Sequence, residues 1–158
     1  MIGDPPVAAS RRVLIVAPQR ASDPALVRAV ADRSAESRSD FTLLVPAVAH
    51  GLHRVVDPED QCCEQAEAEL AAAIPLLSEA AGAPITGVIG SHDPFAAVWD
   101  ALNAGAYDEV IVPSTPNRLA RWLRIDLARR IRGLGVTVSV IGGAGAAERD
   151  RAPLRRAA

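Results

Sequence analysis

The stretch of the sequence that could hold an anion runs from Ser114 to Arg121. Ser114, Thr115 and Asn117 lie in a predicted loop, and Arg118 and Arg121 begin the helix predicted after it. Hydroxyl and guanidinium groups bind phosphate. Positive charges in the first turns of a helix are disfavoured by the helix dipole, and a bound anion would offset this cost. We therefore interpret this stretch as a candidate site for a small anionic ligand. The alternative is a solvated helix face on which the arginines pair with a neighbouring acidic residue, since exposed ion pairs are common.

Prolines stand where three apolar runs end. Pro18, Pro46 and Pro113 each occupy the carboxyl end of a predicted strand, with Gln19 and Val45 beside them. Proline has no backbone N–H, so each one removes a hydrogen-bond donor from the rim on which a phosphate would rest. We predict that this rim is poorly suited to a triphosphate. The alternative is that the prolines only end their strands, which is a common role of proline in loops.

The sequence predicts neither a metal site nor a catalytic nucleophile. His50, His53, Cys62 and Cys63 lie close together in the sequence, but their spacing does not match a zinc-binding pattern. We interpret the two adjacent cysteines as free thiols. No His-Glu-x2-His or phosphate-loop pattern occurs, so we expect no catalytic residue and no metal ligand.

Five apolar runs alternate with helical patterns and would position these residues. The first, second and fourth runs are apolar nearly throughout, which is typical of parallel strands buried on both faces, whereas the third and fifth alternate more and are expected nearer an edge of the sheet. The order of elements predicts an α/β fold of the Rossmann-like type, with a doubly wound sheet of five parallel strands and helices on both faces. The predicted strands are residues 13–17, 41–45, 85–89, 110–112 and 136–141.

Three of the intervening helices are predicted to begin with an Asp-Pro pair. Asp can accept hydrogen bonds from the free backbone N–H groups, and Pro suits the first helical position. These pairs are Asp23-Pro24, Asp57-Pro58 and Asp93-Pro94. The third helix then carries apolar residues at the spacing of a core-facing stripe, and Gly105 ends it. That predicted stripe consists of Phe95, Val98, Trp99 and Leu102.

The arrangement of the strands indicates where a ligand would bind. In open parallel sheets, ligands bind beyond the carboxyl ends of the strands, where the strand order reverses. Four predicted loops lie at that edge, at residues 18–22, 46–53, 90–93 and 113–118. The candidate site residues fall in these loops or within one helical turn of them.

Length and charge are those of an ordinary globular domain. The chain has 158 residues, of which 49% are hydrophobic and 23% charged, and its net charge is −2. We predict one domain at residues 12–142, between a disordered segment at 1–11 and a flexible tail rich in Arg and Ala at 143–158. The small net charge gives no general attraction to nucleic acid or to anionic membranes. Without a signal peptide or an apolar run that could span a bilayer, the chain is expected to be cytoplasmic.

The order of the elements and two segments resemble the universal stress protein family over residues 12–141. Residues 90–98 (GSHDPFAAV) are similar to the family's Gly-x-Pro segment, which opens the third helix. Residues 108–114 (DEVIVPS) are similar to the strand that leads to the family's phosphate loop. The resemblance implies a strand order of 3-2-1-4-5, a role in the stress response and a homodimer formed through the last strand at 136–141.

The sequence departs from the family where its ATP-binding members hold the nucleotide. Those members carry a Gly-x2-Gly-x9-Gly-Ser/Thr loop after the fourth strand, whereas residues 113–127 contain no glycine. They also carry Asp at the end of the first strand, where Pro18 stands here. We therefore predict a divergent member that binds no cofactor, or that binds ATP or AMP only through a remodelled loop.

The leading hypothesis is a non-catalytic binding or regulatory module that does not bind ATP in the usual way. The first alternative is an adenine-nucleotide-binding universal stress protein with a remodelled phosphate loop. The second is an enzyme of the wider nucleotide hydrolase-like superfamily. We disfavour the enzyme because residues 16–20 (VAPQR) contain neither the Ser-Gly-Gly-x-Asp-Ser nor the His-x-Gly-His motif of such enzymes.

Overall fold

The computed structural model describes residues 10–17, 21–48, 58–113, 118–141 and 148–149, and at 58–62, 118–124 and 148–149 it describes the backbone alone. Strands and helices alternate along most of the chain. In chain order, the elements are β1 (Arg11–Val16), α1 (Pro24–Glu36), β2 (Ser39–Pro46), α2 (Pro58–Ala81), β3 (Thr86–Gly90), α3 (Pro94–Ala104), β4 (Glu109–Pro113), α4 (Arg118–Arg132), β5 (Thr137–Ile141) and β6 (Glu148–Arg149).

β1 lies inside the sheet because it pairs with β2 on one side and with β4 on the other. The strand order is β3-β2-β1-β4-β5-β6. The first five strands in this order are parallel, which confirms the fold class and strand order predicted from the sequence. β6 is antiparallel to β5 and pairs with Ser139 and Val140. The apolar runs do not predict β6, since both of its residues, Glu148 and Arg149, are charged.

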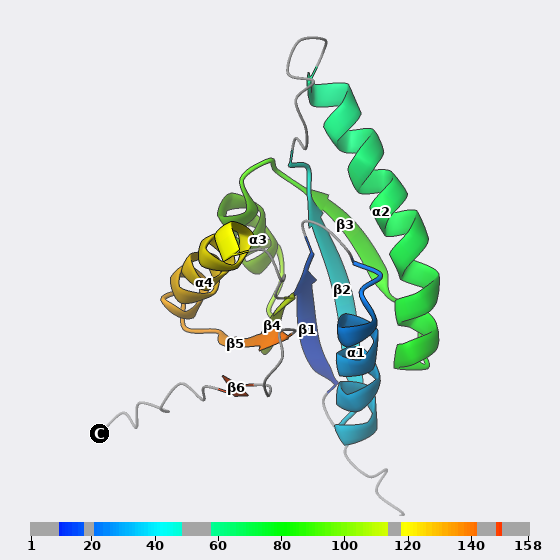
Figure 1. Ribbon diagram of the computed structural model, residues 1–158. Helices are drawn as coiled ribbons and strands as arrows, with labels where there is room; N and C mark the ends of the chain where they lie inside the picture. Colours follow the sequence, from blue (N-terminus) through cyan, green and yellow to red (C-terminus); the bar gives the residue numbers. More distant parts are fainter. Residues whose placement is uncertain (1–9, 18–20, 49–57, 114–117, 142–147, 150–158) are drawn as a thin grey trace, which may run out of the picture.

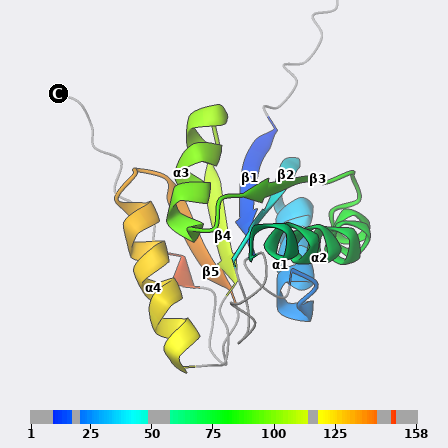
Figure 2. The same cartoon turned by 90° about the horizontal axis from the view of Figure 1, so that it is seen from above.

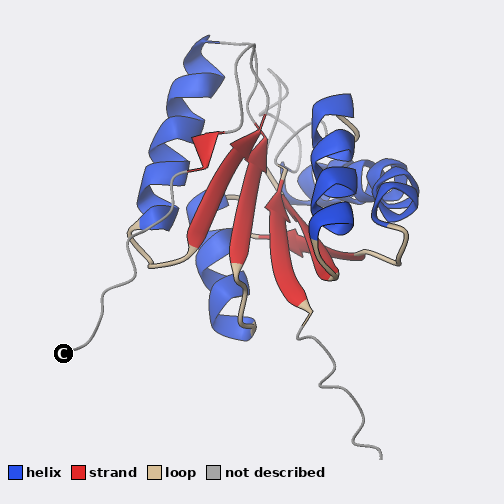
Figure 3. Ribbon diagram, turned by 90° about the horizontal axis from the view of Figure 1, so that it is seen from below, coloured by secondary structure: helices blue, strands red, loops and turns tan. Residues whose placement is uncertain are grey.

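Helices cover both faces of the sheet (Figures 1 and 2). Each face has its own core. On the face of α1 and α2, the side chains of Val13 and Ile15 are fully buried. On the face of α3 and α4, the side chains of Leu14 and Val16 are fully buried. Successive residues of β1 therefore enter opposite cores, as the alternation of side chains along a strand requires. Figure 3 shows the resulting layers of helix, sheet and helix from below.

The Asp-Pro pairs begin helices as the sequence predicts. Asp23 and Asp93 accept hydrogen bonds from backbone N–H groups of the first helical turn, at 2.8 to 3.0 Å. Pro58 begins α2, whereas Asp57 lies outside the described residues. Gly105 caps the C-terminus of α3, which confirms where that helix was expected to end.

α2 is the longest of the described helices and contains Pro75. A proline inside a helix is expected to kink or split it, because its ring clashes with the preceding turn and it has no N–H to donate. The helix is not split, since it runs without a break from Pro58 to Ala81. Neither α2 nor another helix in the described part of the chain combines the length and the apolar character needed to cross a membrane.

Candidate functional site

The strand order reverses between β1 and β4, so the crevice predicted for a ligand lies beyond the carboxyl ends of these strands. Ala17, directly after β1, is fully buried there, and Pro113 at the end of β4 is also buried. Among the predicted site residues, Val45 and Pro46 are described in full, and both are buried at the end of β2. Val45 packs into the core beneath α1 and α2, so its side chain contributes to the floor of this edge and not to its open surface.

The remaining predicted site residues are not described in full. Arg118 and Arg121 lie in the first turns of α4, where the structure describes the backbone alone. Their position after β4 and at the helix N-terminus agrees with the sequence analysis. Outside the described residues lie Pro18, Gln19, Ser114, Thr115 and Asn117.

Several backbone N–H groups at the carboxyl edge are already engaged within the fold. The Ala17 N–H donates to a carbonyl of β2 at 3.0 Å, and the Ala47 N–H donates to a carbonyl of β3 at 3.1 Å. The Val48 N–H donates to the carbonyl of Pro46 at 2.8 Å. Pro46 and Pro113 have no N–H. An anion at this edge must therefore be held by side chains, or by backbone at other positions.

Glu69 of α2 contacts the same edge. Its Oε1 accepts a hydrogen bond from the N–H of Ala21 at 2.5 Å, and Ala21 is fully buried ahead of α1. Glu69 was not among the residues predicted for the site. A signal was present, because Glu69 shares a helix stripe with the buried Ala66, Ala73 and Leu77, and a carboxylate at such a position needs a partner. The bond joins α2 to the β1–α1 connection and engages a further N–H near the crevice.

The turn from β3 into α3 is built for close packing. A Cβ on Gly90 would lie 2.5 Å from the Cβ of Ala97 and 2.9 Å from Cδ1 of Leu44, so glycine lets the helix approach the sheet. Three residues later, Asp93 caps α3. The hydrogen bond from the Ala96 N–H holds the pKa of Asp93 below its ordinary value against the opposing effect of burial, and the charge of Arg130 adds to the lowering. The N–H groups of this helix start are therefore occupied by the protein's own carboxylate.

A buried ion-pair network lies at the amino ends of the strands, where β4 begins. Glu109 is 1% exposed, and its Oε1 accepts from Arg33 Nη2 at 2.8 Å while its Oε2 accepts from Arg33 Nε at 3.1 Å. Ser139 Oγ on β5 donates to Oε1 of Glu109 at 2.5 Å. Arg11 Nη2 lies 3.4 Å from Oε2 of the same carboxylate. The network joins α1, β1, β4 and β5 beneath the end of α1.

The charged groups of this network stabilise one another. Burial raises the pKa of Glu109, but the hydrogen bonds from Arg33 and Ser139 and the positive charge of Arg33 outweigh it, so the pKa is lowered. The pKa of Arg33 is raised, chiefly by its hydrogen bond to Glu109. The pair was not predicted, although Arg33 continues the buried helix stripe of Leu26 and Val30. Because the network lies at the amino ends of the strands, we assign it to structure and not to the ligand crevice.

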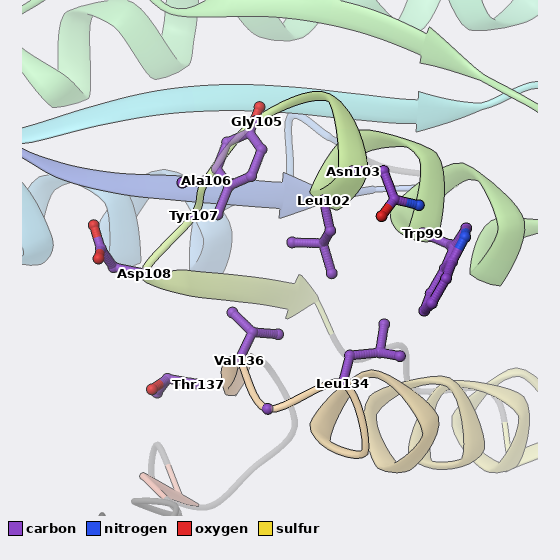
Figure 4. Close-up of a pocket in the computed structure, with 11 residues that line it drawn as sticks. Trp99, Leu102, Asn103, Gly105, Ala106, Tyr107, Asp108, Leu134, Val136 and Thr137 are labelled. Atoms are coloured by element: carbon purple, nitrogen blue, oxygen red, sulfur yellow. The ribbon is translucent and has the colours of Figure 1, made fainter.

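A pocket of about 740 Å³ also lies at the amino ends of the strands, between the C-terminal ends of α3 and α4. Leu102 of α3 faces Leu134 and Val136, which precede β5, across this pocket (Figure 4). Asn103 and Thr137 contribute polar groups to its lining. The pocket does not coincide with the crevice at the carboxyl ends, and its facing apolar side chains offer little for chemistry.

Trp99 lines this pocket and is 47% exposed, so its predicted place in the core stripe is wrong. The buried face of α3 is centred on Ala97 and Val98. Successive residues lie about 100° apart around a helix axis, so Trp99 lies about 150° from the middle of a face centred between Ala97 and Val98. The pattern of apolar spacing indicated the face of the helix to within one residue, but not which large side chain is covered.

The described part of the chain holds no group of three or more His, Cys, Asp or Glu side chains placed to bind a metal ion. Cys63 is an exposed free thiol there. His50, His53 and the side chain of Cys62 lie outside the described residues.

No protein-family model matches the sequence, and no curated protein matches it either. Solved structures do resemble the fold. A universal stress protein in complex with cAMP aligns with a TM-score of 0.61 and 17% identity, over 85% of this chain and 99% of that one. The universal stress protein of Lactobacillus plantarum aligns with a TM-score of 0.59 and 18% identity, over 85% and 99% of the two chains. That of Archaeoglobus fulgidus in complex with dAMP gives 0.56 and 13%, over 85% and 98%.

Proposed function

From the universal stress protein fold that this chain adopts, we propose that it is a non-catalytic ligand-binding module with a regulatory role in the stress response. Its ligand is a small anion bound in the crevice between β1 and β4, and the best candidate is an adenine nucleotide with a single phosphate. Two of the similar structures were solved with such nucleotides, one with cAMP and one with dAMP. The module would act in the cytoplasm.

The engaged backbone at the carboxyl edge is the observation that carries this proposal. The N–H groups of Ala17, Ala21, Ala47 and Val48 are all bonded within the fold. A triphosphate needs several backbone donors, and each charge-assisted hydrogen bond contributes about 1.5–3 kcal/mol. A monophosphate needs fewer, and arginine forks can supply them. We therefore assign the phosphate to the arginines that begin α4. ATP would not bind through a glycine-containing backbone loop, as it does in the ATP-binding members of the family.

Calorimetry and thermal shifts on the full chain test the ligand. AMP should bind, whereas ATP at about 100 μM should produce no shift, although a micromolar ligand at that concentration would stabilise the fold by about 2.7 kcal/mol. Arg118→Ala should weaken AMP binding by about tenfold or more, the equivalent of one charge-assisted contact. Arg129→Ala is the matched control, since Arg129 is exposed in the last turn of the same helix.

Two results would contradict the ligand assignment. A clear shift with ATP at that concentration, abolished by Arg118→Ala, would favour a remodelled triphosphate loop in its place. The absence of any response to AMP, cAMP or ATP would remove adenine nucleotides from consideration.

We further propose that the module is a homodimer formed through residues 136–141. β5 ends the parallel part of the sheet, and in the described part of the chain its outer edge pairs with β6 at Ser139 and Val140. A second copy could add its own β5 along this edge, because an edge strand presents backbone groups for pairing. Light scattering at micromolar concentration should give twice the mass of the chain. Val138→Pro should remove the dimer, and Val88→Pro in β3, the opposite edge strand, should not.

A further inference from the structure

We propose that β6 competes with a second copy of the chain for the outer edge of β5, so that the protein's own C-terminal segment limits its dimerisation. This inference rests on the homodimer proposed above and adds a control on it.

β5 is a fixed strand with one edge to offer. It pairs with β4 along its whole length, from Glu109 opposite Thr137 to Pro113 opposite Ile141. Val138 is buried in the core of α3 and α4, while Ser139 on the other face donates to the carboxylate of Glu109. Neighbours on one edge and on both faces thus hold β5 in place. Its outer edge is a ready template for another strand.

β6 occupies the middle of that edge. Arg149 is opposite Ser139 and Glu148 is opposite Val140, and β6 runs antiparallel to β5. Figure 1 shows the short β6 beside β5. Two copies of β5 related by a two-fold axis must also run antiparallel, because the axis reverses the strand direction. Ser139 is the central residue of β5, where such an axis would pass. β6 and the β5 of a second copy therefore require the same backbone groups and cannot pair there together.

β6 is a weak occupant of the edge. It pairs with two residues of β5, whereas a second β5 could pair with all five. The six residues that join the two strands, 142–147, are three glycines and three alanines. Glycine loses more conformational freedom on ordering than other residues, so fixing this connection against β5 opposes the pairing. The covalent connection to β5 favours β6, because it gives this strand an effective concentration of about millimolar. Because pairing with a second copy is bimolecular and pairing with β6 is not, protein concentration shifts the balance between the two occupants.

The edge strand at the other side of the sheet, β3, is less suited to pairing with a second copy. β3 contains Gly87 and Gly90 among its five residues. Glycine weakens a strand because it has no side chain to pack and more freedom to lose. The competition therefore concerns β5.

Three full-length chains test the proposal by sedimentation over about 1–100 μM, a range in which mass action shifts a weak dimer. They are the unmodified chain, the double variant Glu148→Pro/Arg149→Pro, and the double variant Glu148→Ala/Arg149→Ala. The double proline variant removes the one backbone N–H by which β6 pairs with β5, since consecutive residues of a strand direct their N–H groups to opposite sides. Alanine removes the same two charges and keeps the backbone. The dimer dissociation constant should fall by about tenfold in the proline variant, the equivalent of one net hydrogen bond. It should stay unchanged in the alanine variant. A chain that ends at Ile141 should behave as the proline variant does.

Amide hydrogen exchange at Ser139 and Val140 separates the outcomes. If the full chain dimerises and the proline variant dimerises no more strongly, the homodimer stands and the competition by β6 is overturned. If every chain remains monomeric, the homodimer itself fails. Faster exchange in the proline variant would then show that β6 covers the edge without competing for it, which also overturns the inference.

Discussion

Arg33 on α1 and Glu109 on β4 are 76 positions apart in the sequence and form a buried ion pair, in which Nε and Nη2 of Arg33 donate to the two carboxylate oxygens. Their side chains are 10% and 1% exposed. Ser139 joins the same carboxylate from β5. The pair therefore links one helix to two neighbouring strands beneath the surface of the sheet.

Loss of either partner of this pair should be costly. Glu109→Ala should lower the free energy of unfolding by about 3–5 kcal/mol, because Arg33 would remain buried without its carboxylate. The double variant Arg33→Met/Glu109→Leu should lose less than Glu109→Leu alone, since it leaves no buried charge without a partner, and Arg11 is partly exposed to water. Urea unfolding of the variants measures both effects. A loss below about 1 kcal/mol in Glu109→Ala would mean that water reaches Arg33.

The same pair predicts a dependence of stability on pH. The pKa of Glu109 in the folded chain lies below its ordinary value of 4.5, so the unfolded chain binds more protons as the pH falls. The stabilisation is fully present above the unfolded pKa and is lost as the pH falls through the folded pKa. The stability difference between the unmodified chain and Glu109→Gln should therefore be constant from about pH 6 to 7 and shrink below about pH 4.5. A difference that grows on acidification would contradict this sign. The pKa of Asp93 is lowered as well, but its effect is present in both chains and cancels.

Trp99→Ala should cost little stability. The side chain is 47% exposed, so its removal should lower the free energy of unfolding by about 1 kcal/mol. Leu14→Ala is the comparison, because Leu14 is fully buried and its truncation should cost about 2–5 kcal/mol. Denaturant unfolding of the two variants under one set of conditions checks the contrast. Equal losses would indicate that Trp99 is covered in solution.

Gly90→Ala should destabilise the fold through steric overlap. The added Cβ would lie 2.5 Å from the Cβ of Ala97, and neither the helix backbone nor a methyl group can move aside cheaply. We expect a loss of about 1–3 kcal/mol, as for other overpacked positions. Gly105→Ala is the control, since the nearest atom to its Cβ is the mobile end of Arg12 at 3.1 Å. It should change stability by no more than about 0.5 kcal/mol. Thermal unfolding would count against the packing argument if the two variants lost equally.

The fold could be predicted from the sequence because the three central strands, β1, β2 and β4, are largely buried on both faces and read as apolar runs. The helix starts were equally visible, since the chemistry of an Asp-Pro pair is local. β6 could not be found in this way, because two charged residues with no apolar pattern pair through their backbone alone. Trp99 was misplaced because helical spacing defines an apolar face only to within a residue.

The candidate site was less predictable than the fold. The contact between Glu69 and Ala21 spans 48 positions, and the contact between Arg33 and Glu109 spans 76. A sequence shows that a charged residue stands in an apolar stripe. Which residue pairs with that buried charge is known only once the helices and strands have packed together. The prolines at the strand ends were the exception, because the missing N–H of proline is a property of the residue itself.

The central position of β1 has a consequence for synthesis. β1 is among the first elements made, and β2 follows soon enough to pair with one of its edges. Its other edge needs β4, which ends at Pro113. At about 5–20 residues per second, a ribosome takes about 5–20 s to make the intervening segment. During that interval, an apolar strand with one open edge is exposed beside other nascent chains on the same messenger. The interior of this sheet is thus the part of the protein most dependent on protection while it is being made.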